Sequence, residues 1–277
     1  MTGLSIELTE GEQARLFTKV GTDNLEALEK FYQGRAFMES RGTKENIEKS
    51  IQLFEESISI DPEFLWPYVF SGWSHFIAAT VPGWSKSPEI SLQKAFDLAQ
   101  KALAIDDSDF RPHLLLADLY LQKGQFDKAV SEAELAVSLN PNAGLAYFRL
   151  AAILGKSGRW KESVLYAEKA IRLNPFPGIW WYFALGHAYF MTGQYDKSIQ
   201  TWKKILEKNP DNIQSHIFLA ACYSLLGRDA EAAAAAKEVL RINPEYSVGA
   251  QAKLLRYKNK ADLERLVAAQ LKAGLPE

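Results

Sequence analysis

The sequence of 277 residues lacks several features that carry chemistry in other proteins. It has a single cysteine, Cys222, which excludes an internal disulfide framework and a zinc site built from cysteines. Its 32 Lys and Arg residues are balanced by 34 Asp and Glu residues. The basic excess typical of proteins that bind nucleic acids is therefore absent. The segment from Met1 to Leu8 lacks a basic stretch followed by an apolar one, which predicts no signal peptide.

Motifs for catalysis and for metal or cofactor binding are also missing. There is no glycine-rich motif of the Walker or dinucleotide-binding type. No alternating pattern of apolar and polar residues predicts β-strands. No histidine is paired with a second His or with a Glu as His-x3-His or His-x2-Glu. We therefore expect no catalytic residues, no metal site and no cofactor in this chain.

What the sequence does contain is an internal repeat. Asn-Pro pairs recur at steps of 34 or 35 residues, and glycines recur at the same steps. The pairs are Asn140-Pro141, Asn174-Pro175, Asn209-Pro210 and Asn243-Pro244, and the glycines are Gly124, Gly158, Gly193 and Gly227. A glycine at these positions is typical of the end of the first helix of a pair, and the proline prevents the second helix of the pair from continuing. The period therefore predicts antiparallel helical hairpins that bury their apolar faces by stacking.

This pattern resembles the tetratricopeptide (TPR) repeat, whose first helix carries a Leu, a small residue and an aromatic residue at fixed spacing. The resemblance is strongest over residues 110–244, where Leu116, Ala117 and Tyr120 begin the series. Two earlier units, each with an insertion, precede it. The resemblance implies an all-α fold, a right-handed α-solenoid of about six TPR helical hairpins with a C-terminal capping helix.

The same register divides the chain into three segments. We expect an N-terminal leader with a short helix over 1–22, the TPR superhelix over 23–245 and C-terminal capping helices over 246–277. Leu263, Leu266, Val267 and Leu271 share one face of a helix over 261–273. A terminal helix that is apolar on one side and polar on the other keeps a solenoid soluble.

Short motifs outside the repeats resemble the C-terminal repeat region of bacterial class III adenylate/guanylate cyclases. They lie at 9–16, 21–27, 83–85 and 271–277. In that family a catalytic cyclase domain, and often a membrane segment, precedes the repeats. The resemblance implies that this chain regulates a cyclase domain that it does not contain. It also implies a soluble region that lies in the cytoplasm or on the periplasmic side of the membrane.

Residues 64–85 carry no charge, and a stretch of this length raises the question of a membrane span. Pro67, Gly72, His75 and Pro82 interrupt its hydrophobicity. The repeat register also explains the stretch as a first helix followed by an inserted loop. We predict no membrane span within this chain.

The first helices of a TPR stack line its concave face, as the resemblance implies. The residues at the lining positions are mostly aromatic or aliphatic: Trp66, Phe70, Trp73, Phe76, Leu114, Leu121, Phe148, Arg149, Trp180, Phe183, His187, Phe190 and Ile217. Two interpretations stay open. The side chains pack between neighbouring helices or under residues 4–20, or they form an apolar groove for a peptide or helix. In the second case Trp180, Phe183, His187 and Phe190, which share one helix face, are partly free to meet a partner.

We therefore predict a non-catalytic protein–protein interaction module with a scaffolding or sensing role in signalling. Its partner is a protein or peptide, and homo-oligomers stay open. The alternative is the regulatory region of a bacterial cyclase. An RNA-binding helical repeat needs a basic stripe, which the charge balance does not provide. The carboxylate clamp of co-chaperone TPR proteins is disfavoured, because only Arg149 has the required chemistry at a clamp position.

Overall fold

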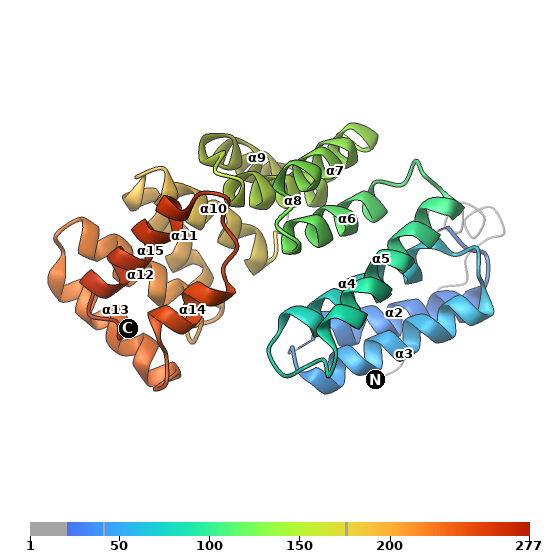
Figure 1. Cartoon of the computed structure of the whole chain (residues 1–277), viewed down its shortest axis with the longest axis horizontal. Helices are drawn as coiled ribbons and strands as arrows, with labels where there is room; N and C mark the ends of the chain where they lie inside the picture. The colour runs from blue at the N-terminus through green and yellow to red at the C-terminus, as the bar shows by residue number, and fades with distance from the viewer. Residues whose placement is uncertain (1–20, 41, 175–176) are drawn as a thin grey trace, which may run out of the picture. The chain divides into compact units, whose positions relative to one another are not determined.

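A computed structural model describes residues 21–40, 42–174 and 177–277 (Figure 1). Most of the predicted leader, residues 1–20, lies outside the described residues, and so does the first cyclase-like motif. Within the described residues the chain forms fourteen helices and no β-strand. The prediction of an all-α helical repeat fold is confirmed.

Twelve of these helices follow one another as six pairs, and two more complete the chain. The pairs are α2 (Leu25–Glu39) and α3 (Lys44–Ile60), α4 (Leu65–Thr80) and α5 (Pro88–Ile105), α6 (Phe110–Gln122) and α7 (Phe126–Leu139), α8 (Gly144–Lys156) and α9 (Trp160–Leu173), α10 (Ile179–Met191) and α11 (Tyr195–Lys208), and α12 (Ile213–Leu225) and α13 (Asp229–Ile242). The last two helices are α14 (Val248–Leu254) and α15 (Lys260–Lys272).

The chain divides into two compact units, residues 1–119 and residues 120–277, which we call unit 1 and unit 2. The division falls inside α6 and inside the segment 23–245, where the sequence analysis expected no boundary. Each unit is described by itself below.

The repeated glycines and Asn-Pro pairs set the helix ends, as the sequence pattern predicted. Gly158 and Gly193 follow α8 and α10 with φ angles of 88° and 76°, a backbone conformation that glycine adopts without steric cost. The next amide returns to the preceding turn, and the N–H of Gln194 donates to the carbonyl of Tyr189 over 2.8 Å. The four repeated asparagines are the C-cap residues of α7, α9, α11 and α13.

Small residues bring the two helices of a hairpin together. In unit 2, a Cβ atom on Gly186 would lie 2.8 Å from the ring of Trp202. Ser198 donates a hydrogen bond of 2.8 Å to the carbonyl of Gly186, and Trp202 is fully buried. In unit 1 a Cβ atom on Gly34 would meet the Phe54 ring at 2.7 Å. Close packing of this kind leaves no room for a larger residue at the small positions.

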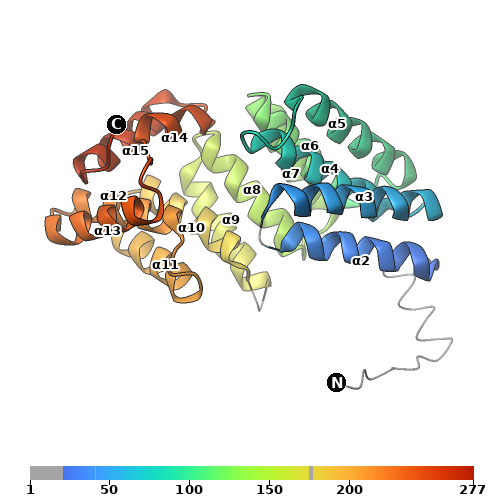
Figure 2. The same cartoon turned by 90° about the horizontal axis from the view of Figure 1, so that it is seen from below.

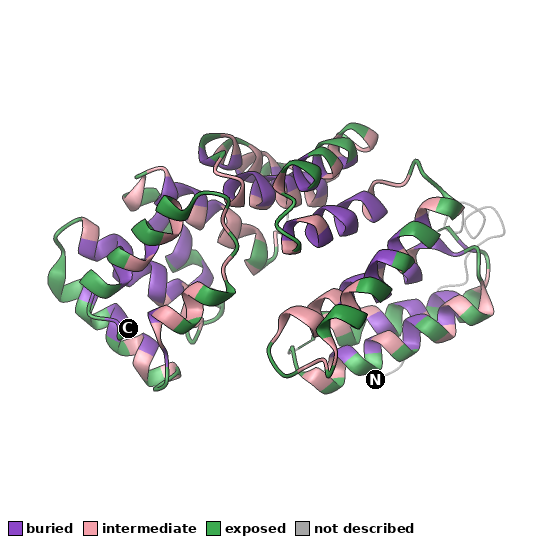
Figure 3. Ribbon diagram, viewed as in Figure 1, coloured by how far each residue is buried: buried purple, intermediate pink, exposed green. Residues whose placement is uncertain are grey.

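The C-terminal helices lie against the first helices of unit 2. Figure 2 shows α14 and α15 on the α12 side of the α12–α13 pair. Leu266 and Ala269 of α15 are buried in the same apolar cluster as Ile217 of α12. Most of α12 is therefore buried, as Figure 3 shows, although it belongs to the last repeat. The terminal helix covers a first helix, so it packs on the face that the sequence analysis assigned to partner binding.

The uncharged stretch 64–85 consists of α4 and the beginning of the loop that follows it. None of the helices in the described part of the chain combines the length and the apolar character that a membrane crossing requires.

Candidate partner-binding surface

The thirteen residues predicted to line a groove differ widely in exposure and are divided between the two units. Trp180 is 70% exposed. Seven residues are half-buried: Trp66, Phe70, Phe76, Phe148, Arg149, Phe183 and His187. Five residues are buried in the interior: Trp73, Leu114, Leu121, Phe190 and Ile217. These five do not belong to the candidate surface, because side chains that are at most 8% exposed offer a partner almost no contact area unless the fold opens.

In unit 1, arginine side chains lie on the aromatic face of α4. The guanidinium group of Arg111 lies 4.1 Å from the ring centre of Trp66, within the range of a cation–π contact. Two hydrogen bonds to the carboxylate of Asp109, of 2.9 and 2.6 Å, hold this guanidinium group in place. Arg35 of α2 lies 5.4 Å from the ring centre of Phe70. This part of the predicted lining is therefore partly covered by residues of its own unit.

The side chain of Trp73 on α4 is buried by residues of its own unit. Its indole N–H donates to the carboxylate of Asp118 over 3.2 Å, and both residues are buried. A hydrogen bond to a charged group is stronger than one between neutral groups. Trp73 is therefore part of the packing between α4 and α6, which corresponds to the first of the two interpretations of the aromatic residues.

In unit 2, the first part of α10 carries the most exposed aromatic side chain of this set. The ring centres of Trp180 and Phe183 are 5.1 Å apart, and Phe183 meets the ring of Trp202 edge-on at 5.2 Å. Trp202 stacks in turn on Phe218, with ring centres 4.6 Å apart and planes 7° apart. Trp180 is thus the exposed end of an aromatic series that continues into the core. Rings arranged in this way hold one another in position.

The second half of α10 is covered by a residue that the sequence analysis did not identify. The hydroxyl group of Tyr257 lies 2.8 Å from Nε2 of His187. The His187 ring also lies 4.9 Å from the ring centres of both Trp160 and Phe218. Burial lowers the pKa of His187 to about 3, so the imidazole is neutral at physiological pH. Tyr257 lies outside the repeats and has no repeat register, so no periodic signal could place it here.

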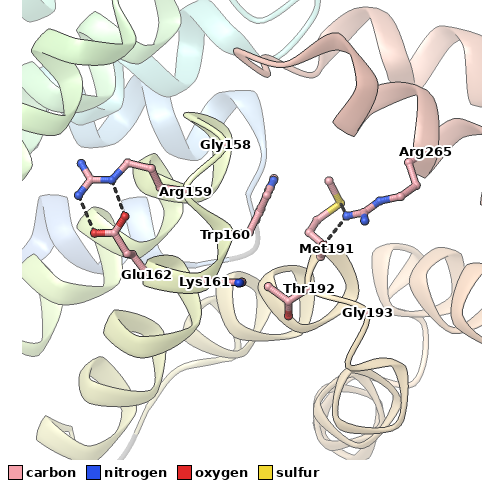
Figure 4. A pocket seen from close by; sticks show the side chains of 9 residues that line it. All are labelled: Gly158, Arg159, Trp160, Lys161, Glu162, Met191, Thr192, Gly193 and Arg265. Carbon is pink, nitrogen blue, oxygen red and sulfur yellow. Dashed lines mark hydrogen bonds and ion pairs between the residues drawn. The ribbon is translucent and has the colours of Figure 1, made fainter.

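A pocket of about 560 Å³ opens beside this contact (Figure 4). Its lining comes from the turn after α8, the start of α9, the end of α10 and α15: Gly158, Arg159, Trp160, Lys161, Glu162, Met191, Thr192, Gly193 and Arg265. Arg265 donates a hydrogen bond to the backbone carbonyl of Met191. The indole N–H of Trp160 donates to the carboxylate of Asp262 over 2.8 Å. The two hydrogen bonds attach α15 to the first residue of α9 and to the last residue of α10.

Two reactive side chains of the described residues, Cys222 and His75, are buried. Cys222 is fully buried, and burial raises the pKa of its thiol to about 12, so the nucleophilic thiolate is scarce at neutral pH. Burial lowers the pKa of His75 to about 4. Within the described ranges, no three His, Cys, Asp or Glu side chains are grouped as a metal site requires.

Comparison with known proteins identifies the repeat. One tetratricopeptide repeat model matches residues 91–154 and 189–254, and a second matches residues 145–177. Together they cover more than half of the chain. Among the curated proteins no match is found.

Solved structures of repeat proteins have a similar fold. A chain of the APC/C hetero-tetramer Cut9–Hcn1 aligns with a TM-score of 0.68 at 18% identity, covering 92% of this chain and 46% of that one. This chain therefore spans less than half the length of that relative. The pilF protein of Pseudomonas aeruginosa aligns with a TM-score of 0.58 at 15% identity, covering 80% of this chain and 94% of that one. A thermophilic TPR protein of Thermus thermophilus, TTC0263, aligns with a TM-score of 0.57 at 14% identity, with coverages of 71% and 98%. At these identities the likeness concerns the fold alone.

Proposed function

Because the chain belongs to the tetratricopeptide repeat family, we propose that it is a non-catalytic module that binds a protein partner through an aromatic surface on α10. The observation that carries the proposal is the exposure of Trp180. This side chain is 70% exposed and rests on Phe183, which is held by the buried Trp202. A tryptophan fixed in this way offers a partner a large apolar area at a low cost in side-chain entropy.

The surroundings of Trp180 favour an apolar segment of the partner. Helix α10 contains no charged residue. Its neighbour Trp181 stacks on Phe148 of α8, with ring centres 5.5 Å apart and planes 18° apart. The surface around the start of α10 is therefore aromatic, and it fits the apolar side of a peptide or amphipathic helix. An anchor of this type contributes about 2 kcal/mol or more to binding, which is roughly a thirtyfold change in affinity.

Site-specific photo-crosslinking in the native host tests this proposal. A benzoylphenylalanine replaces Trp180 in one variant of the chain. In the control variant it replaces Leu165, a 56% exposed apolar residue on the second helix α9. We expect a discrete protein to be captured at position 180 and not at position 165. Once it is identified, Trp180→Ala is expected to weaken its binding about thirtyfold. Equal capture at both positions, or full affinity of Trp180→Ala, would place the interface elsewhere.

Regulation of a nucleotide cyclase is a narrower form of this proposal, and it is supported only by the short flanking motifs. The last of them, 271–277, has a packing role in this chain. Leu275 is buried, and the carbonyl of Pro276 accepts a hydrogen bond of 2.9 Å from the N–H of Val248. This motif is therefore explained without a cyclase. We expect the chain to form no cyclic nucleotide from ATP or GTP with Mg²⁺ or Mn²⁺, and turnover that survives repurification would contradict its non-catalytic role.

A further inference from the structure

The segment between α14 and α15 lies on the repeats in the manner of a bound peptide. We call residues 255–259 the strap; they are not helical. The backbone N–H of Lys258 donates to the carbonyl of Lys156, at the end of α8, over 2.9 Å. The ammonium group of Lys258 lies 2.7 Å from the carboxylate of Asp127 in α7. An extended segment held through both its backbone and its side chains is a common form of peptide recognition.

The central contact of the strap is the side chain of Tyr257. Its hydroxyl group bonds to Nε2 of His187 over 2.8 Å, and its ring centre lies 5.9 Å from that of Trp160. The residues that receive it are held by the repeats and by α15, whose Asp262 accepts the indole N–H of Trp160. Phe218 supports His187 from one side and is itself stacked on the buried Trp202. The receiving site therefore does not depend on the strap for its shape.

The strap is attached much more weakly than the helix that follows it. Leu266 and Ala269 of α15 are 2% exposed and lie in the core cluster of unit 2. Asp262 and Arg265 add hydrogen bonds to α9 and α10. The strap contributes two half-buried side chains, Leu255 and Tyr257, and its ion pair joins side chains with exposures of 45% and 91%. An exposed pair of this kind stabilises little, so fewer strong contacts hold the strap than hold α15.

We propose that the strap is an intramolecular competitor that occupies the binding site of a partner segment. That segment is an extended peptide with a tyrosine followed by a basic residue. The tyrosine replaces Tyr257 between His187 and Trp160, and the basic residue replaces Lys258 beside Asp127. This inference rests on the proposed function, since it specifies the partner and adds a step in which the strap is displaced. The strap resists displacement because its tether gives it an effective concentration in the millimolar range.

The hydroxyl group makes the site selective for tyrosine over phenylalanine. A phenylalanine ring would fill the same space beside Trp160 but would leave Nε2 of His187 without its bond to Tyr257. Losing a hydrogen bond at a half-buried site is expected to weaken binding about tenfold.

Peptide binding to a full-length chain with a released strap tests the inference. Arg256→Gly, Tyr257→Ser, Lys258→Gly and Asn259→Ser are combined, so that α14 and α15 stay joined by a linker of the same length. The probe is a fluorescent peptide with the sequence of residues 253–262, and it is compared with two versions in which phenylalanine or alanine replaces its tyrosine. Arg256→Ala is the matched control, because Arg256 is exposed and its hydrogen bond goes to the carbonyl of Lys253 in the neighbouring α14.

We expect the tyrosine peptide to bind the released chain at least tenfold more tightly than the unmodified chain or the Arg256→Ala control. The phenylalanine peptide should bind the released chain about tenfold more weakly, and the alanine peptide should show no saturable binding. Equal affinity for the released and unmodified chains would overturn the inference, and so would failure of the tyrosine peptide to bind a folded released chain.

Hydrogen exchange provides a readout that does not require the multiple substitution. In Tyr257→Ala we expect the Lys258 amide to exchange at least tenfold faster, while the amides of α15, such as Gln270, are unchanged. If the two sets of amides accelerate together, the strap and α15 open as one element and the inference fails.

The peptide assay does not depend on Trp180. If the peptide assay fails while position 180 captures a partner, the proposed function stands without the competitor. If the peptide binds the released chain while position 180 captures nothing, the competitor stands and the partner site is not at Trp180.

Discussion

Helices α4 of unit 1 and α10 of unit 2 have the same kind of sequence and different surroundings. Both are uncharged first helices with aromatic residues at the predicted lining positions. On α4, Trp66 lies under the Arg111 guanidinium group and Trp73 bonds to Asp118, and both partners come from the next first helix. On α10, Tyr257 from outside the repeats covers His187, and Trp180 is exposed. Identical repeat positions therefore have different roles, depending on what lies over them.

The difference follows from the chemistry of the covering residues. Arg111 lies over the indole ring of Trp66, and Asp118 accepts a hydrogen bond from the indole N–H of Trp73. These aromatic side chains of α4 are therefore used for packing within unit 1. Among the described residues, the ring contact of Trp180 is with Phe183, which lies on the same face of α10. The four predictions that follow test this contrast, in order of decreasing effect on stability.

Deletion of residues 259–277 is expected to have the largest effect. It removes α15 and exposes the apolar side of α12. Two buried leucines, Leu266 and Leu275, contribute about 1.5–3 kcal/mol each, and the buried alanines and hydrogen bonds of α15 add to this. We expect unit 2 to lose more than about 5 kcal/mol of its free energy of unfolding, measured by denaturant titration followed by circular dichroism. An unchanged unfolding curve would show that the C-terminal helix is not part of the core.

Phe190→Ala is expected to be the most destabilising single substitution on α10. Phe190 is fully buried and packs edge-on against Phe218, with ring centres 5.4 Å apart. Truncation of a buried phenylalanine costs about 3–5 kcal/mol. Thermal unfolding should detect this loss, and Leu165→Ala on the exposed side of α9 serves as the control with little change. A small effect of Phe190→Ala would mean that the covered half of α10 is accessible, and the contrast within α10 would disappear.

Trp73→Phe tests the covering of α4 in unit 1. The phenylalanine ring keeps most of the apolar contact and removes the indole N–H that bonds to Asp118. We expect a loss of about 1.5–3 kcal/mol in the free energy of unfolding, because the acceptor is a carboxylate. Trp84→Phe, at a half-buried tryptophan in the loop after α4, is the control. Equal effects of the two substitutions would indicate that the bond to Asp118 contributes nothing to stability.

Trp180→Ala is expected to have the smallest effect on stability and the largest effect on fluorescence quenching. Its side chain is 70% exposed, so the free energy of unfolding should change by less than about 0.5 kcal/mol. The other six tryptophans are buried or half-buried. Acrylamide should therefore quench a smaller fraction of the emission in the variant than in the unmodified chain. Unchanged quenching would show that Trp180 is covered in solution.

The helical hairpins were predictable from the sequence because their signals are local. Gly158 and Gly193 adopt positive φ where the sequence placed the ends of first helices. Asn174 and Asn209 are C-cap residues where it placed the ends of second helices. Each signal acts within a few residues of its own position, so the period of the sequence becomes the period of the structure.

The exposure of the lining residues was not predictable in the same way. Trp180, Phe183, His187 and Phe190 share a helix face in the sequence pattern, yet they range from 70% exposed to fully buried. The amphipathic pattern predicts which side of α10 is apolar, but it does not predict which residues cover that side. Phe190 therefore packs in the interior, whereas Trp180 has the exposed area that the groove interpretation requires.

The helices, their ends and the small residues at which two helices of a hairpin meet follow from local sequence patterns. Which aromatic side chains reach the surface depends instead on tertiary contacts. The reason is the distance along the chain between the contacting residues: Tyr257 meets His187 across 70 positions, and Asp262 meets Trp160 across 102. Contacts of this range depend on how the C-terminal segment folds back over the first helices, and they leave no periodic trace in the sequence.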